Sequence, residues 1–193
     1  MGRHKKYIKE EVLRKAMKTF WDHGFENTSS RLLEKNLSVN QKTLYSDFGN
    51  KHDIFLQALD TYYDLNQSKI LAPLIHSEGD LRDIQTFFEN FIHEVKYGES
   101  PNGCLFANTT MEFGSSDRTI LEKLDKYYEL LQGCFVQLLQ KAHDRGIISE
   151  ELDIQKTANY LVGCTEGLTV IVKVKSKDFL SDYVEIIIKS LKK

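Results

Sequence analysis

The stretch TSSRLLEKNLSVNQKTLYSDFGNKH, residues 28–52, carries two short apolar stripes separated by a polar turn. The stripes, each at helical spacing, are Leu32, Leu33 and Leu37, then Val39, Leu44 and Phe48. Two helices of about two turns each are not stable alone in water. The stretch therefore predicts a helix-turn-helix over about 29–48 that requires a third helix to complete its core.

Residues 8–23 supply that third helix. Their apolar side chains recur at helical intervals before Gly24, a residue type that commonly ends helices. These side chains are Ile8, Val12, Leu13, Ala16, Met17, Phe20 and Trp21. We expect three helices to share one small core.

The second short helix has a start signal and a polar outer face. Ser38 is followed three residues later by Gln41, as in a capping box, which predicts a helix beginning near Val39. The polar residues of this helix are Asn40, Gln41, Lys42, Thr43, Tyr45 and Ser46. Such side chains can bind phosphate oxygens or base edges in a major groove. The alternative is a polar face that only contacts solvent, but the preceding turn and supporting helix favour a face that contacts DNA.

Lys51 opens the next helical run after the expected cap Asn50. The helix dipole disfavours a cation at that position, so a visiting anion would explain it. Lys51 and the backbone N–H groups of the helix terminus could clamp a phosphate. An ordinary surface lysine is the alternative interpretation.

The pattern TLYxxFxxK at residues 43–51, with Thr28-Ser29 before it and Phe55 after it, resembles the N-terminal domain of tetracycline-repressor-type (TetR/AcrR) transcriptional regulators. The resemblance covers residues 8–60. It implies DNA contacts by Thr28, Ser29, the polar residues from Asn40 to Ser46, and Lys51.

Two positions depart from the family pattern. The family has a small residue and then glycine before the valine, where this chain has Leu37 and Ser38. Ser38 must then adopt a turn conformation without the freedom of glycine. Lys42 stands where many members have glycine, which strengthens the helix and adds positive charge.

Composition separates a basic N-terminal part from an acidic remainder. The 193 residues have a net charge of −2, yet residues 1–52 hold 11 basic and 6 acidic residues, and the rest hold 15 and 22. This asymmetry is typical of a DNA-binding head on a body that avoids DNA. No apolar run approaches a membrane span, and no secretory signal follows the basic start. Three scattered cysteines without CxxC spacing indicate a reduced, cytoplasmic protein.

The remaining chain predicts helices near 51–71, 80–96, 104–113, 117–145, 153–175 and 178–191. Residues 168–174 alternate like a strand, but a lone strand would have no partner, so we expect a helix there. The expected fold is all-α with about nine helices: an N-terminal DNA-binding domain, 1–52, and a C-terminal regulatory and dimerisation domain, 53–193. The helix after residue 50 would link the two parts and transmit movement between them.

The last two helices carry more apolar surface than a small body readily hides, which predicts a four-helix dimer interface. The expected interface residues are Ile154, Ala158, Leu161, Leu168, Phe179, Tyr183, Val184, Ile187 and Ile188. The alternative is that both stripes are internal core. The family resemblance favours a homodimer.

A small-molecule pocket in the body is implied by the same resemblance, since a pocket combines apolar lining with a few polar anchors. The candidate lining is Phe91, Cys104, Phe106, Asn108, Met111, Glu112, Tyr127, Tyr128 and Cys164. Cys104 follows a glycine at a helix start, where backbone N–H groups would lower its pKa and make it a reactive sensor. A small buried hydrophobe is the alternative.

Two classes of function remain from the sequence. The first is a homodimeric repressor that binds a palindromic double-stranded operator and is released by a small-molecule effector. The second is a helical interaction protein or an enzyme with a degenerate head. No metal-ligand, phosphate-loop or nucleophile motif occurs, so we expect neither catalysis nor a cofactor or metal.

Overall fold

The computed structural model describes residues 7–98 and 102–192, and every regular element within these ranges is an α-helix. The helices are α1 (Lys9–His23), α2 (Ser30–Leu37), α3 (Gln41–Phe48), α4 (Lys51–Lys69), α5 (Ala72–Ile75), α6 (Leu81–Tyr97), α7 (Leu105–Phe113), α8 (Arg118–Asp144), α9 (Ile154–Ile171) and α10 (Lys177–Leu191). The expected all-α fold is confirmed. The sequence did not predict α5 as a separate helix. Pro73 explains it, because proline lacks the N–H that a continuing α4 would need.

Most helices begin at a polar side chain that accepts a hydrogen bond from the first turn. These caps are Ser29, Asn40, Asn50, Asp80, Asp117, Asp153 and Ser176. The strand-like stretch near the end of α9 is helical up to Ile171, with Leu168 and Val172 buried. Local capping and periodicity therefore account for most of the helix boundaries.

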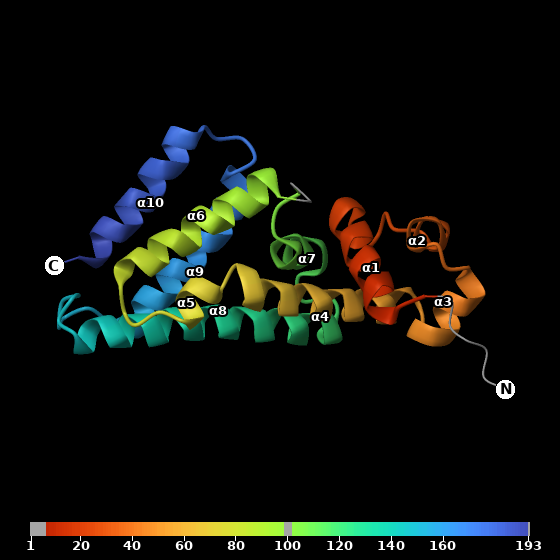
Figure 1. Cartoon of the computed structure of the whole chain (residues 1–193), viewed down its shortest axis with the longest axis horizontal. Helices are drawn as coiled ribbons and strands as arrows, with labels where there is room; N and C mark the ends of the chain where they lie inside the picture. Colours follow the sequence, from red (N-terminus) through yellow and green to blue (C-terminus); the bar gives the residue numbers. More distant parts are fainter. Residues whose placement is uncertain (1–6, 99–101, 193) are drawn as a thin grey trace.

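The molecule is elongated, with α1 to α3 forming a head at one end and α5 to α10 forming the body (Figure 1). Helix α4 runs from the head into the body alongside α8, and α10 lies on the outer side next to α6. Within the head α1 packs across α4, where the rings of Phe20 and Phe55 meet edge to face at 4.9 Å. The first turns of α4 thus complete the small core of the head.

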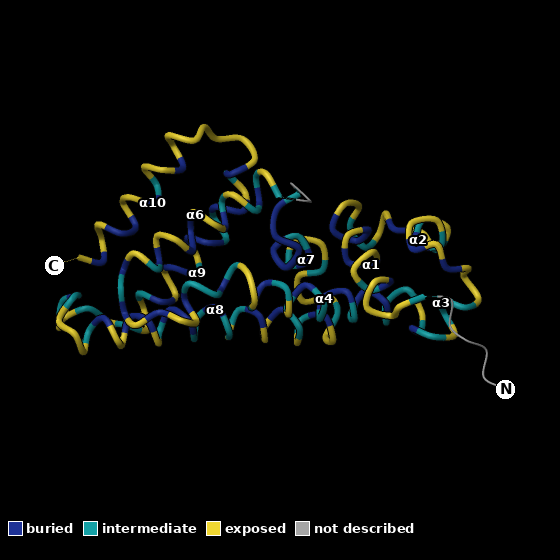
Figure 2. Tube along the Cα trace, viewed as in Figure 1, coloured by how far each residue is buried: buried dark blue, intermediate teal, exposed yellow. Residues whose placement is uncertain are grey.

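Burial follows this arrangement: the inner sides of the helices are buried and the outer side of α10 is exposed (Figure 2). One continuous apolar core runs from α1 to α10. Among the helices of the described ranges, none combines the length and the apolar character that crossing a bilayer requires.

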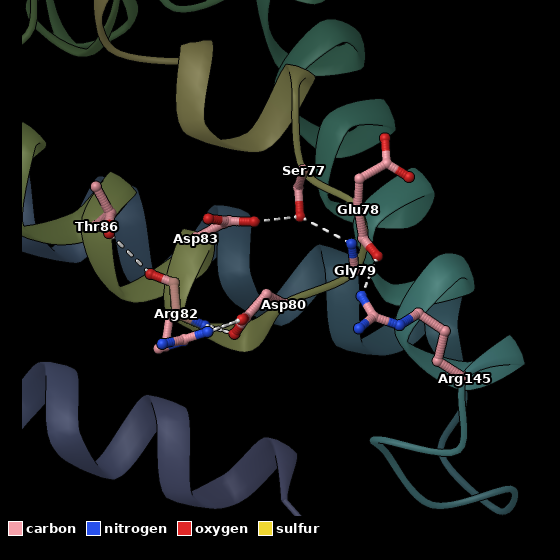
Figure 3. Close-up of polar contacts among 8 residues, drawn as sticks. All are labelled: Ser77, Glu78, Gly79, Asp80, Arg82, Asp83, Thr86 and Arg145. Carbon is pink, nitrogen blue, oxygen red and sulfur yellow. Dashed lines mark hydrogen bonds and ion pairs between the residues drawn. The ribbon is translucent and has the colours of Figure 1, made fainter.

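The turn between α5 and α6 is fixed by polar contacts to α6 and to the end of α8 (Figure 3). The Ser77 hydroxyl donates to Asp83 at 2.7 Å and accepts from the Gly79 N–H at 3.0 Å, while Arg145 donates to the carbonyl of Glu78. Gly79 has φ of 88°, and a Cβ there would lie 2.7 Å from the backbone of α8. A glycine is required here because both conformation and space exclude a side chain.

Candidate nucleic-acid interface

Helices α2 and α3 form the expected helix-turn-helix. Leu33, Leu37, Val39, Leu44 and Phe48 are all buried against one another and against α1 and α4. This packing turns the remaining side of α3 outward. The sequence-based prediction of the two apolar stripes is confirmed, with Leu32 only partly buried.

The predicted capping box between Ser38 and Gln41 is wrong. Ser38 ends α2 in the left-handed conformation, with φ of 56° and ψ of 32°. An N-cap residue needs extended backbone angles, so Ser38 cannot cap α3. Asn40 does so instead, its Oδ1 accepting from the Thr43 N–H at 3.0 Å. The helix consequently starts at Gln41, two residues later than expected.

Ser38 is the one non-glycine residue with positive φ in the described ranges, which gives a direct prediction. Ser38→Gly should raise the free energy of unfolding by about 0.5–1 kcal/mol, because the left-handed strain exceeds the extra chain entropy that glycine loses. Ser46→Gly, an exposed position inside α3, should lower it by a similar amount. Urea unfolding of both variants measures the difference. Equal destabilisation by both would contradict the prediction.

The outward side of α3 has the polar character expected of a surface that contacts nucleic acid. Asn40, Gln41, Lys42 and Ser46 are exposed, and Thr43 is partly exposed. Tyr45 is partly buried, and its hydroxyl donates to the Ser30 Oγ of α2. The α3 surface, meaning these six side chains of residues 40–46, therefore presents amides, a cation and hydroxyls together.

Thr28 does not belong to the α3 surface. It is fully buried, and its hydroxyl donates to the Gly24 carbonyl at 2.6 Å. Its side chain therefore holds the turn between α1 and α2 rather than facing a duplex, which corrects the expectation drawn from the family resemblance. The neighbouring Ser29 is exposed and caps α2 by accepting from the Leu32 N–H at 3.2 Å.

Lys51 occupies the first position of α4, as expected, after the cap Asn50. Asn50 and Asp53 form a reciprocal capping box, at 3.1 and 2.9 Å. The Lys51 ammonium lies 4.2 Å from the centre of the Phe25 ring. This cation–π contact orients the lysine at the helix terminus, where it remains partly exposed.

Head and body are joined by polar contacts near both ends of α7. The Glu112 carboxylate accepts from the backbone N–H groups of Phe25 and Glu26 at 3.0 and 2.8 Å. The Trp21 indole donates to the Gly103 carbonyl at 2.8 Å. We call these the head–body contacts. They show that Glu112, expected in a pocket of the body, binds the head instead.

Two other expected pocket residues also lie elsewhere. Met111 is 85 % exposed on the outer side of α7. Asn108 donates to the Asn102 carbonyl at 2.8 Å and lines a cavity of about 240 Å³ between head and body. The amphipathic pattern of residues 104–113 did not reveal which side of α7 faces the head.

The structure brings only part of the expected lining together. Phe106 stacks on Tyr127 with ring centres 4.2 Å apart, and Tyr127 contacts Tyr128 at 5.3 Å. Phe91 packs against Phe87 on its own helix, 6.1 Å away. Cys164 lies between α9 and α10, where it contacts Tyr160 and Tyr183.

Cys104 lies near the stacked rings of Phe106 and Tyr127, which we call the Phe106–Tyr127 group. It is not the reactive thiol that its position suggested. It is buried beside Tyr62, and this burial raises the pKa of the thiol to about 11. Hydrogen bonds from backbone N–H groups at the start of α7 act in the opposite direction and are outweighed. The hypothesis of an activated thiolate is therefore wrong for this conformation.

Sequence reasoning missed Glu166, which lies among these side chains. Burial raises the pKa of its carboxyl to about 7, while a hydrogen bond with Tyr128 lowers it. The signal was present in the sequence. Helix α9 is otherwise apolar or neutral-polar, and its charged residues are Lys156 and Glu166.

The expected dimer-interface residues are mostly core of a single chain. Those buried within the protomer are Ala158, Leu161, Leu168, Val184, Ile187 and Ile188. Of the other three, Ile154 and Tyr183 are partly exposed and Phe179 is 42 % exposed. The predicted stripes of α9 and α10 are therefore mostly the sides that pack onto the body.

The fold, with a helix-turn-helix head on a helical body, is that of a bacterial transcriptional regulator. Residues 12–58 match the model described as bacterial regulatory proteins, tetR family, and residues 81–185 match the tetracyclin repressor-like C-terminal domain. The chain belongs to the tetR family.

Known proteins similar to this chain agree with that assignment. The uncharacterised HTH-type transcriptional regulator YezE of Bacillus subtilis is 28 % identical over 189 residues, covering 96 % of this chain and 97 % of YezE. The HTH-type transcriptional repressor ComR of Escherichia coli is 28 % identical over 170 residues, 88 % of this chain and 81 % of ComR. A cysteine mutant of the TetR family regulator CifR, solved with 26-bp operator DNA, has a TM-score of 0.88 at 19 % identity, covering 98 % of this chain and all of that one.

Proposed function

We propose that the protein is a cytoplasmic, non-catalytic, homodimeric repressor. It binds a palindromic operator through the α3 surface and leaves the operator when a small molecule binds in the body. The single observation that carries the DNA-binding part is the exposed polar side of α3, held on a buried helix-turn-helix core. This is the arrangement in which a recognition helix enters a major groove.

Roles can be proposed for individual residues of the head. Gln41 and Lys42 are exposed at the start of α3, the part of a recognition helix that reaches base edges. Tyr45 of the α3 surface, together with Ser29 and Lys51, would contact phosphates. Oriented by Phe25, the Lys51 ammonium would meet the backbone beside the groove.

The test of DNA binding is a footprint on the DNA upstream of the protein's own gene at two salt concentrations. Lys42→Ala should weaken binding about 10-fold and reduce the salt slope by about one, because a phosphate or base contact is lost. Lys177→Ala, the same charge change on exposed α10, should leave both unchanged. Binding that is equal on any DNA and indifferent to Lys42→Ala would contradict the proposal.

Dimerisation is proposed through the exposed sides of α9 and α10. On α9 the residues Tyr160, Gly163, Gly167 and Val170 recur every three or four positions and face outward or are partly exposed. On α10 the corresponding residues are Phe179, Tyr183 and Ile186. We call these seven residues the dimer face.

Contacts between the helices join the two stripes of the dimer face. The Tyr183 hydroxyl lies 3.6 Å from the Cβ position of Gly167. Apart from its chain neighbours and the adjacent turns of its own helix, no atom of the described residues lies within 4 Å of the Cβ position of Gly163. Glycines at the centre of the α9 stripe would let a helix of the second subunit approach α9 closely. Val170 and Ile186 are 69 % and 60 % exposed, which is unusual for such side chains unless a partner covers them.

Coupling between effector and DNA is proposed to run through α4 and the head–body contacts. Helix α4 belongs to the core of the head at Phe55 and to the interior of the body at Tyr62, whose ring lies 5.1 Å from that of Phe106. His52 of α4 contacts the cap of α8, Asp117, at 2.8 Å. A ligand that displaces the Phe106–Tyr127 group would tilt α4 and change the separation of the two α3 surfaces.

A further inference from the structure

Glu166 is a partly buried side chain whose carboxylate the described residues do not fully satisfy. Its Oε1 atom is buried and has no hydrogen-bond partner. Within residues 7–98 and 102–192, no lysine, arginine or histidine forms an ion pair with it. A buried carboxylate without a cation destabilises a fold. The residue is thus better suited to a partner from outside the chain than to stability.

Aromatic side chains surround the charge. The Tyr128 hydroxyl reaches the Glu166 carboxylate and also lies 3.1 Å from the Thr110 hydroxyl. Behind it, Tyr127 stacks on Phe106. Ring faces attract cations, and a carboxylate set among rings is the environment that binds an organic ammonium group.

A surface cavity lies beside Tyr128, the side chain whose hydroxyl contacts Glu166, while Glu166 itself does not line it. It has a volume of about 320 Å³ and is lined by Asp125, Tyr128, Glu129, Gln132, Asn159 and Val162. Tyr128 forms part of this lining and also contacts Glu166, while Val162 lies one turn before Glu166 on α9. The volume is within the range of small-molecule sites.

The charge of the cavity selects the sign of its ligand. Its lining holds the carboxylates of Asp125 and Glu129 and no basic side chain. Together with Glu166 these groups make the local potential negative, which concentrates cations and repels anions. A neutral ligand would leave the Oε1 atom of Glu166 without a donor unless it carried a hydroxyl or amide.

We propose that the cavity between α8 and α9 binds an apolar organic cation, with a primary ammonium group donating to Glu166 and an apolar skeleton against Tyr128 and Val162. Tyr128 swings aside to admit it. This inference rests on the proposed function, because such a cation would be the effector that releases the operator.

The experiment uses three probes of one shape: 4-phenylbutylamine, 4-phenylbutanol and 4-phenylbutyrate. Titration calorimetry on the full-length protein should show the amine binding at least 10-fold more tightly than the alcohol, and the carboxylate not binding. Glu166→Gln should weaken amine binding at least 10-fold. Glu129→Gln, which removes an exposed charge of the cavity rim, should weaken it by about 3-fold or less.

Two results would overturn the site: equal binding of amine and alcohol, or unchanged amine binding in Glu166→Gln. If Glu166→Gln does not fold, the comparison of the three probes on the unaltered protein decides alone. Operator release is measured on the same samples. Amine binding without release refutes the effector role and keeps the site, whereas absence of operator binding refutes the proposed function and leaves the calorimetric test valid.

Discussion

Replacing both Val170 and Ile186 by aspartate is expected to convert the protein from dimer to monomer and to lower operator affinity by about 100-fold or more. Two linked subunits that each bind a half-site have an overall affinity about 10²–10⁴-fold higher than one subunit alone. This gain in affinity is lost when the subunits separate. Both side chains are mostly exposed in the protomer, so the substitutions leave its core intact. Aspartates on the dimer face would instead place unpaired charges in the interface.

Sedimentation equilibrium measures the oligomeric state of the variant, and circular dichroism verifies that it is still helical. Met111→Asp is the control, because it introduces an aspartate at an 85 % exposed apolar residue on α7 that is not part of the dimer face. That variant should remain dimeric. A Val170→Asp, Ile186→Asp protein that stays dimeric and binds its operator normally would show that the subunits meet elsewhere.

Glu166→Gln is expected to raise the free energy of unfolding by about 3 kcal/mol above pH 7. Burial raises the pKa of Glu166 to about 7 from the ordinary value of 4.5. Because the carboxyl ionises more easily in the unfolded chain, the free energy of unfolding falls as pH rises from 4.5 to 7. Above pH 7 the contribution of Glu166 no longer changes. Each pKa unit corresponds to about 1.4 kcal/mol.

The sign of this effect is the opposite of that for a carboxylate in a salt bridge. Below pH 4.5 the carboxyl is protonated in both states, so the variant and the unaltered protein should differ little. Urea unfolding at pH 4.5, 6 and 8, at one protein concentration, measures the difference. Glu129→Gln, an exposed position, should show no such pH-dependent gap. If the difference in the free energy of unfolding between Glu166→Gln and the unaltered protein does not decrease at low pH, the effect arises from packing rather than from the charge.

These two predictions concern opposite aspects of the body. In the proposed dimer, the exposed apolar side chains of the dimer face would stabilise the assembly and contribute little to the protomer. The charge of Glu166 would weaken the protomer and, in the proposed site, bind the ligand. Functional sites commonly contain residues that lower the stability of the fold.

Helix positions and the α3 surface followed from the sequence because both depend on local spacing. Leu33, Leu37, Leu44 and Phe48 are buried wherever two short helices pack on a third, and the polar residues between them must then face outward. The start of α3 was misplaced by two residues. Ser38 and Asn40 are both capable caps, and their backbone angles, which depend on how α2 ends, decided between them.

The tertiary structure alone decided which apolar stripe became core and which became surface. Ile186 and Ile187 are equally apolar by residue type, but in the folded chain, where α10 packs on α6, Ile187 is buried and Ile186 is 60 % exposed. In the same way, a carboxylate and a thiol have ordinary pKa values in an extended chain. Glu166 and Cys104 acquired raised pKa values because helices distant in sequence enclosed them, and desolvation depends on the whole fold.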